Sequence, residues 1–273
     1  MTTVGEALAE AATRIDRRDA LVLVAHALAV DRAWLVANDQ DALSGESAQR
    51  LQQLVAEREQ GVPVAYLTGT REFYGRPFSV NRSVLIPRPE TELLVEAAIA
   101  RLPHGGRLLD LGTGSGAIAI TIACERPDAE VTATDLSAEG LRLAQSNAKG
   151  LGARVRFLEG DWFDCVTDES FDVIVSNPPY VAAGDEHLGQ GDLRYEPLRA
   201  LTDGSEDGLA SLRRLIATAP RHLRACGWLL VEHGYDQARA CARLFSEAGY
   251  VAPIAIADLA GITRIAGGRR ANP

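Results

Sequence analysis

The tetrapeptide Asn177-Pro178-Pro179-Tyr180 combines residue types that can hold a flat NH2 group. An Asn oxygen and a proline carbonyl can both accept hydrogen bonds from such a group, and a Tyr ring can lie against its face. The four residues follow an apolar run at 171–176, which is long enough for a buried strand. Two prolines end that strand because neither can donate to a β-ladder. We therefore predict a clamp for a planar amine or amide. Its catalytic residues are Asn177, Pro178 and Tyr180, and Pro179 also contacts substrate. The alternative is a proline-rich turn without function.

A glycine-rich loop lies about 60 positions earlier. It follows a predicted strand at 107–110 and precedes a predicted helix, and its glycines let the backbone approach a ligand closely. Asp135 follows a second predicted strand, where an acid can hydrogen-bond ribose hydroxyls. Dinucleotide folds use a similar glycine pattern, so the loop leaves NAD and S-adenosylmethionine (SAM) both open. The loop residues predicted to bind the cofactor are Asp110, Gly112, Thr113, Gly114, Ser115 and Gly116.

Two acidic positions favour SAM over NAD. Asp110 can meet the cationic end of SAM. Asp161 and Trp162 follow a third predicted strand, at the place where an adenine would lie. Trp162 offers a stacking face and Asp161 an acceptor for the exocyclic amine. The alternatives are a helix N-cap role for Asp161 and core packing for Trp162.

Hydrophobic periodicity predicts the elements that position these residues. Residues 1–70 read as a helical domain of about four helices, and 71–88 as a β-hairpin linker whose strands flank Gly75-Arg76. Residues 89–273 alternate strands and helices, as in a doubly wound parallel sheet with two closing strands at the end. We expect an α/β, Rossmann-like methyltransferase sheet joined to a small all-helical N-terminal domain. The long polar segment 181–207 is expected to be functional.

Composition excludes several partners. The 273 residues carry a formal charge of −9, and residues 1–90 hold 10 arginines against 12 acids. A broad surface for direct nucleic-acid binding is therefore not expected. The histidines lack metal-ligand spacing, so no metal site is expected. The N-terminus has no charged segment followed by an apolar one, and no apolar run is long enough to cross a bilayer. We expect a cytoplasmic protein without a membrane partner.

Several further segments identify a family. The residues at 86–92, 176–180, 191–197, 230–234 and 258–261 closely resemble the PrmC (HemK) family. Members of this family use SAM to methylate the glutamine of the Gly-Gly-Gln motif in peptide chain release factors. The specific resemblance runs from about residue 62 to the end of the chain.

The resemblance implies roles for individual residues. It places Asp135, Trp162 and Asn177 against SAM together with residues 112–116, and it places residues 177–180 against the substrate glutamine. It also suggests that Arg88 and Glu196 line the substrate cleft, with a salt-bridged surface loop as the alternative. The implied partner is a release factor, and the helical domain is expected to dock it. An adenine-N6 DNA or RNA methyltransferase remains the alternative function, because the clamp cannot itself distinguish adenine's amine from a glutamine amide.

Overall fold

The computed structural model describes residues 2–272, and they form two compact units. One unit contains the chain through Thr70 together with Gln190–Tyr195. The other contains Arg71–Gly189 and the chain from Glu196 onward. Within the described residues no helix is long and apolar enough to cross a membrane.

The first unit is helical. Its helices are α1 (Val4–Arg14), α2 (Arg17–Leu28), α3 (Arg32–Ala37), α4 (Gly45–Glu59) and α5 (Val64–Thr68). Asp16, Asp31 and Ser44 cap α2, α3 and α4, and Thr3 forms a capping box with Glu6 at α1. The sequence predicted about four helices, and the fifth, α5, is a short helix that begins after Pro63. Leu23, Val24 and Val55 are among the side chains of its own apolar core.

Residues from the long segment after the strand β6 (Phe171–Ser176) also belong to this helical unit. Arg58 pairs with Asp192 at 2.9 Å, and the Tyr195 hydroxyl donates to the Gln60 carbonyl at 2.7 Å. The segment contains short helical turns at η2 (Glu186–Gly189), η3 (Gly191–Tyr195) and α9 (Leu198–Leu201). It is therefore an ordered excursion with its own contacts rather than a structureless loop.

The hairpin consists of β1 (Thr70–Phe73) and β2 (Arg76–Ser79). Its turn is Tyr74-Gly75, one position before the predicted Gly75-Arg76, and both turn residues have positive φ. Two positive φ values match the twist of a tight hairpin, which explains the shift. The turn is held because the Tyr74 amide donates to Glu92 at 2.8 Å.

The large sheet has seven strands in the order β5-β4-β3-β6-β7-β9-β8. Five of them are parallel, and β9 is antiparallel to both β7 and β8. The sequence predicted the two closing strands without giving their direction. The short turn between β8 and β9 permits only an antiparallel pair. The strands are β3 (Arg107–Leu111), β4 (Glu130–Asp135), β5 (Val155–Glu159), β6 (Phe171–Ser176), β7 (Leu223–Glu232), β8 (Val251–Ala257) and β9 (Thr263–Arg269).

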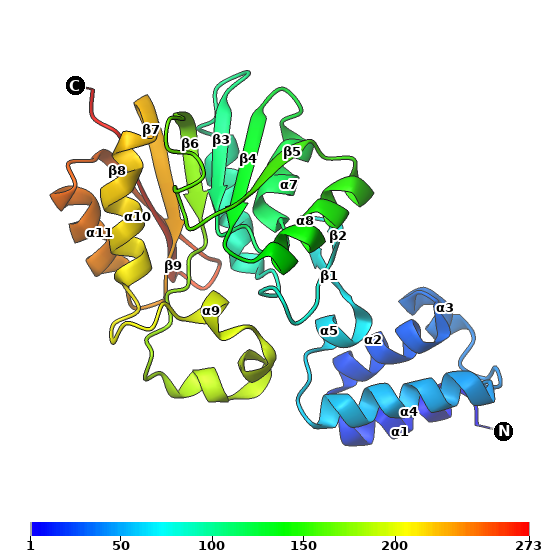
Figure 1. Ribbon diagram of the computed structural model, residues 1–273. Coiled ribbons are helices and arrows are strands. Elements are labelled where there is room, and N and C mark those ends of the chain that lie inside the picture. Colours follow the sequence, from blue (N-terminus) through cyan, green and yellow to red (C-terminus); the bar gives the residue numbers. More distant parts are fainter. Residues whose placement is uncertain (1, 273) are drawn as a thin grey trace. The chain divides into compact units, whose positions relative to one another are not determined.

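Helices cover both faces of this sheet (Figure 1). Leu108 packs with α6 (Glu92–Ile99) and α7 (Ala117–Glu125) on one face, together with the end of α8 (Ala138–Leu151). Leu109 packs with α10 (Ala210–Thr218) and α11 (Ala238–Glu247) on the other. Neighbouring strand residues thus point to opposite cores, as the pleat requires. The expected fold class is confirmed: a seven-stranded methyltransferase sheet, a helical N-terminal region and a β-hairpin.

Candidate functional site

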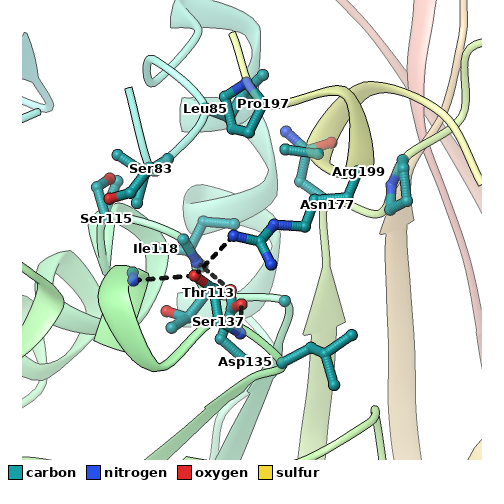
Figure 2. Close-up of a pocket in the computed structure, with 18 of the residues that line it drawn as sticks. Ser83, Leu85, Thr113, Ser115, Ile118, Asp135, Ser137, Asn177, Pro197 and Arg199 are labelled. Atoms are coloured by element: carbon teal, nitrogen blue, oxygen red, sulfur yellow. Dashed lines mark hydrogen bonds between the residues drawn. The ribbon is translucent and has the colours of Figure 1, made fainter. Parts of the chain in front are cut away.

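The glycine loop and the Asn-Pro-Pro-Tyr segment leave adjacent strands at the same sheet edge. Leu111 at the end of β3 is in register with Ser176 at the end of β6. The chain order changes direction between these two strands, since β4 follows β3 on one side and β6 lies on the other. Such a switch point opens a crevice at the carboxyl ends of the strands. A pocket lies there, and Figure 2 shows Ser83 and Ser115 on the side opposite Asn177.

The glycine loop is shaped by backbone hydrogen bonds. The amides of Gly112 and Thr113 donate to the Thr134 carbonyl at 2.9 and 3.0 Å. Gly112 has φ of +73°, and a Cβ there would lie 3.4 Å from the Trp162 ring. The positive φ favours glycine at this position, whereas a Cβ would only come into ordinary van der Waals contact with the indole. Gly112, Thr113, Gly114 and Ser115 line the pocket, whereas Gly116 does not and instead precedes α7.

Asp135 lines the pocket and also organises the loop. One carboxylate oxygen accepts from the Gly114 amide and the other from the Ser137 amide, both at 2.8 Å. A carboxylate has about four acceptor positions, so it can still accept ribose hydroxyls. Its contact with the cofactor stays a prediction.

Asp161 and Trp162 also line this pocket. The Trp162 backbone has φ of +55°, and its carbonyl accepts from the Thr134 hydroxyl at 3.2 Å. Asp161 Oδ2 pairs with Arg214 at 2.7 Å, with both side chains a little under half exposed. The Trp162 ring thus lies next to Gly112, and the Asp161 carboxylate lines the same pocket, which suits adenine binding.

Asp110 lies beneath the loop, fully buried, and does not line the pocket. Its Oδ2 accepts from the Thr113 hydroxyl at 2.6 Å, while Oδ1 has no hydrogen-bond partner in the part of the chain that the structure describes. Burial raises the pKa of Asp110 to about 7. An orphan acidic oxygen beneath a ligand loop fits a cationic ligand, because a positive charge would compensate its desolvation. Direct contact with SAM stays a prediction.

The clamp residues divide between the pocket and the core. Asn177 and Pro179 line the pocket, whereas Pro178 and Tyr180 do not. Asn177 Nδ2 donates to the Thr91 hydroxyl at 3.2 Å. The Tyr180 hydroxyl instead reaches Glu232 at 3.2 Å, and burial raises the pKa of Tyr180. The roles of Asn177, Pro178 and Tyr180 in catalysis stay predictions.

Arg88 and Glu196 form an ion pair at 2.5 Å beside this pocket. Arg88 lines the pocket, and Glu196 is buried and also accepts from the Ile86 amide at 3.0 Å. Since Glu196 is shielded from water, the pair differs from the surface salt bridge considered as the alternative. It fixes the segment before η1 (Pro89–Thr91) against the start of α9.

Several pocket residues were not predicted individually. Arg199 donates to the Ser137 hydroxyl at 3.3 Å across the pocket (Figure 2). Thr91 lies inside segment 86–92, one of those that resemble the PrmC (HemK) family. The resemblance therefore drew attention to this segment but assigned no role to Thr91. Arg199 follows the segment 191–197 and had no such signal. The other unpredicted lining residues include Ser83, Val84, Leu85, Pro87, Ala117, Ile118, Leu136, Ser137, Gly140, Gly160, Pro197 and Ala200.

These residues fit SAM. The glycine loop permits close backbone approach, Asp135 suits a ribose, Trp162 suits an adenine, and the orphan oxygen of Asp110 suits a cation. Across residues 2–272 no group of three or more His, Cys, Asp or Glu side chains could hold a metal ion.

Comparison with solved structures supports the methyltransferase fold. A methyltransferase from Pyrococcus furiosus superposes with a TM-score of 0.56 at 20% identity, covering 81% of this chain and 98% of that one. Residues 89–191 match the family described as "Methyltransferase small domain". The fold and pocket therefore define a SAM-dependent methyltransferase.

Close relatives narrow this class. Residues 2–69 match the family described as "PrmC N-terminal domain", which extends the similarity into the helical unit. A "Release factor glutamine methyltransferase" of Xylella fastidiosa is 51% identical over 265 residues, 96% of each chain. One of Neisseria gonorrhoeae is 49% identical over 259 residues, 94% of each chain. The chain belongs to the PrmC (HemK) family of release factor glutamine methyltransferases.

Proposed function

We propose that this protein transfers the methyl group of SAM to the side-chain amide nitrogen of the glutamine in the Gly-Gly-Gln motif of peptide chain release factors. The observation that carries the proposal is the position of Asn177. It lines the same pocket as Asp135 and the glycine loop, in a chain about half identical to curated release factor glutamine methyltransferases. A planar NH2 held by Asn177 would therefore face the cofactor.

The reaction needs help because an amide nitrogen is a poor nucleophile. Its lone pair is shared with the carbonyl, and the same resonance gives a peptide bond a rotation barrier of ~18–20 kcal/mol. In our proposal the Asn177 Oδ1 and the Pro178 carbonyl accept the two amide hydrogens. They orient the nitrogen and stabilise the positive charge that develops on it during attack.

The chemical balance is that of a methyl transfer. SAM supplies a methyl carbon bonded to a positive sulfur, and the nitrogen forms a new N–C bond as the S–C bond breaks. The amide then loses one proton to water, so a base is not needed before attack. Alignment of the reacting atoms can contribute about 7–11 kcal/mol, which exceeds the ~1.5–3 kcal/mol of any single charge-assisted hydrogen bond.

The helical unit is the part of the chain that we assign to release-factor docking. Its match to the PrmC N-terminal domain supports this role. A cytoplasmic location goes with this proposal, because release factors act in translation.

The alternative substrate is adenine in DNA or RNA. The formal charge of −9 disfavours it, because phosphate binding requires a basic surface. A direct comparison tests both. Purified protein is incubated with methyl-labelled SAM and either a release factor, the same factor with its motif changed to Gly-Gly-Glu, or duplex DNA. We expect label only in the unmodified factor. Label in DNA, or equal label in the Gly-Gly-Glu factor, would overturn the proposal.

A further inference from the structure

A buried cluster of hydroxyl and carboxyl groups lies behind Asn177. It joins Thr91 in η1, Tyr180 after β6 and Glu232 at the end of β7. Thr91 and Glu232 are 4% and 2% exposed. The Thr91 hydroxyl donates to Glu232 Oε2 at 2.6 Å, and the Tyr180 hydroxyl donates to Oε1 at 3.2 Å. Asn177 Nδ2 donates to the same Thr91 hydroxyl oxygen at 3.2 Å.

The direction of each hydrogen bond in this cluster follows from the number of hydrogens. An ionised carboxylate only accepts, so Glu232 takes the single hydroxyl hydrogen of Thr91. Thr91 can then only accept from Asn177. The atom of Asn177 that faces Thr91 must therefore be the nitrogen, which leaves Oδ1 on the opposite arm of the amide. The shape of an Asn side chain does not distinguish its oxygen from its nitrogen, and only such a network decides the orientation.

We propose that Glu232, acting through Thr91, sets the orientation of the Asn177 amide so that Oδ1 is presented to the substrate NH2. Glu232 and Thr91 are thus positioning residues. This inference rests on the proposed function. If the amide turned over, its NH2 would face the NH2 of the substrate. Two donors would then oppose one another, and the clamp would be lost.

The orientation of the Asn177 amide depends on the negative charge of Glu232. A proton on Glu232 would let that carboxyl donate to Thr91, and the Thr91 hydrogen would then be free to turn toward Asn177. Thr91, Glu90, Tyr180 and Arg264 are the groups that act on Glu232. Burial raises its pKa to about 7, with Thr91 and Tyr180 opposing that rise. With SAM saturating, so that any pH dependence of SAM binding is removed, methyl transfer should therefore weaken as the pH falls below about 7.

Thr91 offers a matched pair of substitutions. Thr91→Val keeps the shape and removes the oxygen, whereas Thr91→Ser keeps the oxygen. With a release factor as substrate, we expect Thr91→Val to lower kcat roughly 10- to 100-fold, the loss typical of a misdirected hydrogen-bond group in a transition state. The dissociation constant for SAM should change less than about threefold. Thr91→Ser should restore most of kcat. Equal kcat in the two variants would overturn the inference.

A second variant covers the case in which Thr91→Val loses SAM binding or fails to fold. Glu232→Gln cannot titrate, and its Oε1 can still accept from Thr91. At each pH the measurement uses saturating SAM, so that the titration of Asp110 does not act through SAM binding. The wild-type kcat should then fall between pH 8 and pH 6, and the variant should lack this step. The same step in both proteins would refute the role of Glu232. Failure of the wild-type protein to methylate the release factor would instead contradict the proposed function, so the two failures are distinguishable.

Discussion

The glycine-loop side of the pocket is built from short stretches of chain, whereas the Asn177 side is assembled from distant ones. On the loop side, the Thr113 hydroxyl donates a hydrogen bond to Asp110, three positions away in the sequence. The Gly114 amide donates one to Asp135, at a separation of 21 positions. On the other side, Asn177 bonds Thr91 across 86 positions and Thr91 bonds Glu232 across 141. A local motif can thus form a cofactor site, while an oriented amide needs several elements to be in place.

Both sides nevertheless contain a buried carboxyl group. Burial raises the pKa of Asp110 and of Glu232 to about 7. Glu232 has a donor for each of its oxygens, whereas one oxygen of Asp110 has no hydrogen-bond partner among residues 2–272. The substrate side is therefore complete within the chain itself, and the cofactor side has an acceptor left for a cationic ligand. Changes on the two sides should accordingly affect different steps.

The largest effect is expected from Asn177→Ala. It removes an acceptor aimed at the charge that develops on the nitrogen, so kcat should fall about 10²- to 10³-fold. Because Asp135 and Trp162 are untouched, the dissociation constant for SAM should stay within about threefold. Single-turnover methylation and a SAM titration on the same variant measure the two quantities. Turnover like that of the wild-type protein would remove the distinction between the two sides.

The next largest effect is expected from Asp110→Asn, on the pH dependence of the free energy of unfolding. The pKa of Asp110 is raised on folding, so this group stabilises the folded state most at acid pH, and that contribution is lost as the pH rises toward about 7. Asp110→Asn does not titrate. Relative to wild-type protein, the variant should gain roughly 2–3 kcal/mol of unfolding free energy between pH 5 and pH 8. Urea unfolding of both proteins without SAM measures the difference, and a difference independent of pH would contradict a protonated Asp110.

A smaller effect is expected from Asp135→Ala. It removes a charged acceptor of two loop amides and the predicted partner of the ribose, which should raise the dissociation constant for SAM about 10- to 50-fold. Calorimetry measures this constant. At saturating SAM, kcat should remain within about threefold of wild type, since Asn177 keeps its own support. If kcat fell while the dissociation constant for SAM stayed unchanged, Asp135 would act on catalysis and not on cofactor binding, which would contradict this assignment.

Much of the fold could be predicted because its signals are periodic. Strands such as 171–176 are apolar runs ended by prolines or glycines, and they occur where expected. The sequence left the direction of β9 open, since apolar alternation reveals a strand but not its direction, and the structure makes it antiparallel. The hairpin turn was displaced by one residue because Tyr74 adopts a positive φ that its type does not favour.

The residues of the candidate site also differ in whether the sequence carried a signal for their position. Asp135, Trp162 and Asn177 line one pocket, because each follows a strand of the same sheet edge, and their contacts with SAM and substrate stay predictions. The expected contact of the Tyr180 ring with the substrate stays a prediction. The contact of its hydroxyl with Glu232 had no signal in the sequence, because it depends on how β7 lies beside β6. Arg199 had no sequence signal, because a side chain that crosses the pocket from another segment leaves no local pattern.

The amino-acid sequence by itself determined which groups are present at the carboxyl ends of the strands: a glycine loop, two acids, an indole and an amide. It could do so because backbone freedom, strand termination and side-chain chemistry are properties of neighbouring residues. Only the tertiary structure decided which way the Asn177 amide faces and which carboxyl groups lose their water. Both depend on a few atoms from η1, β6 and β7 meeting within hydrogen-bond distance, and such meetings are set by packing across the whole sheet.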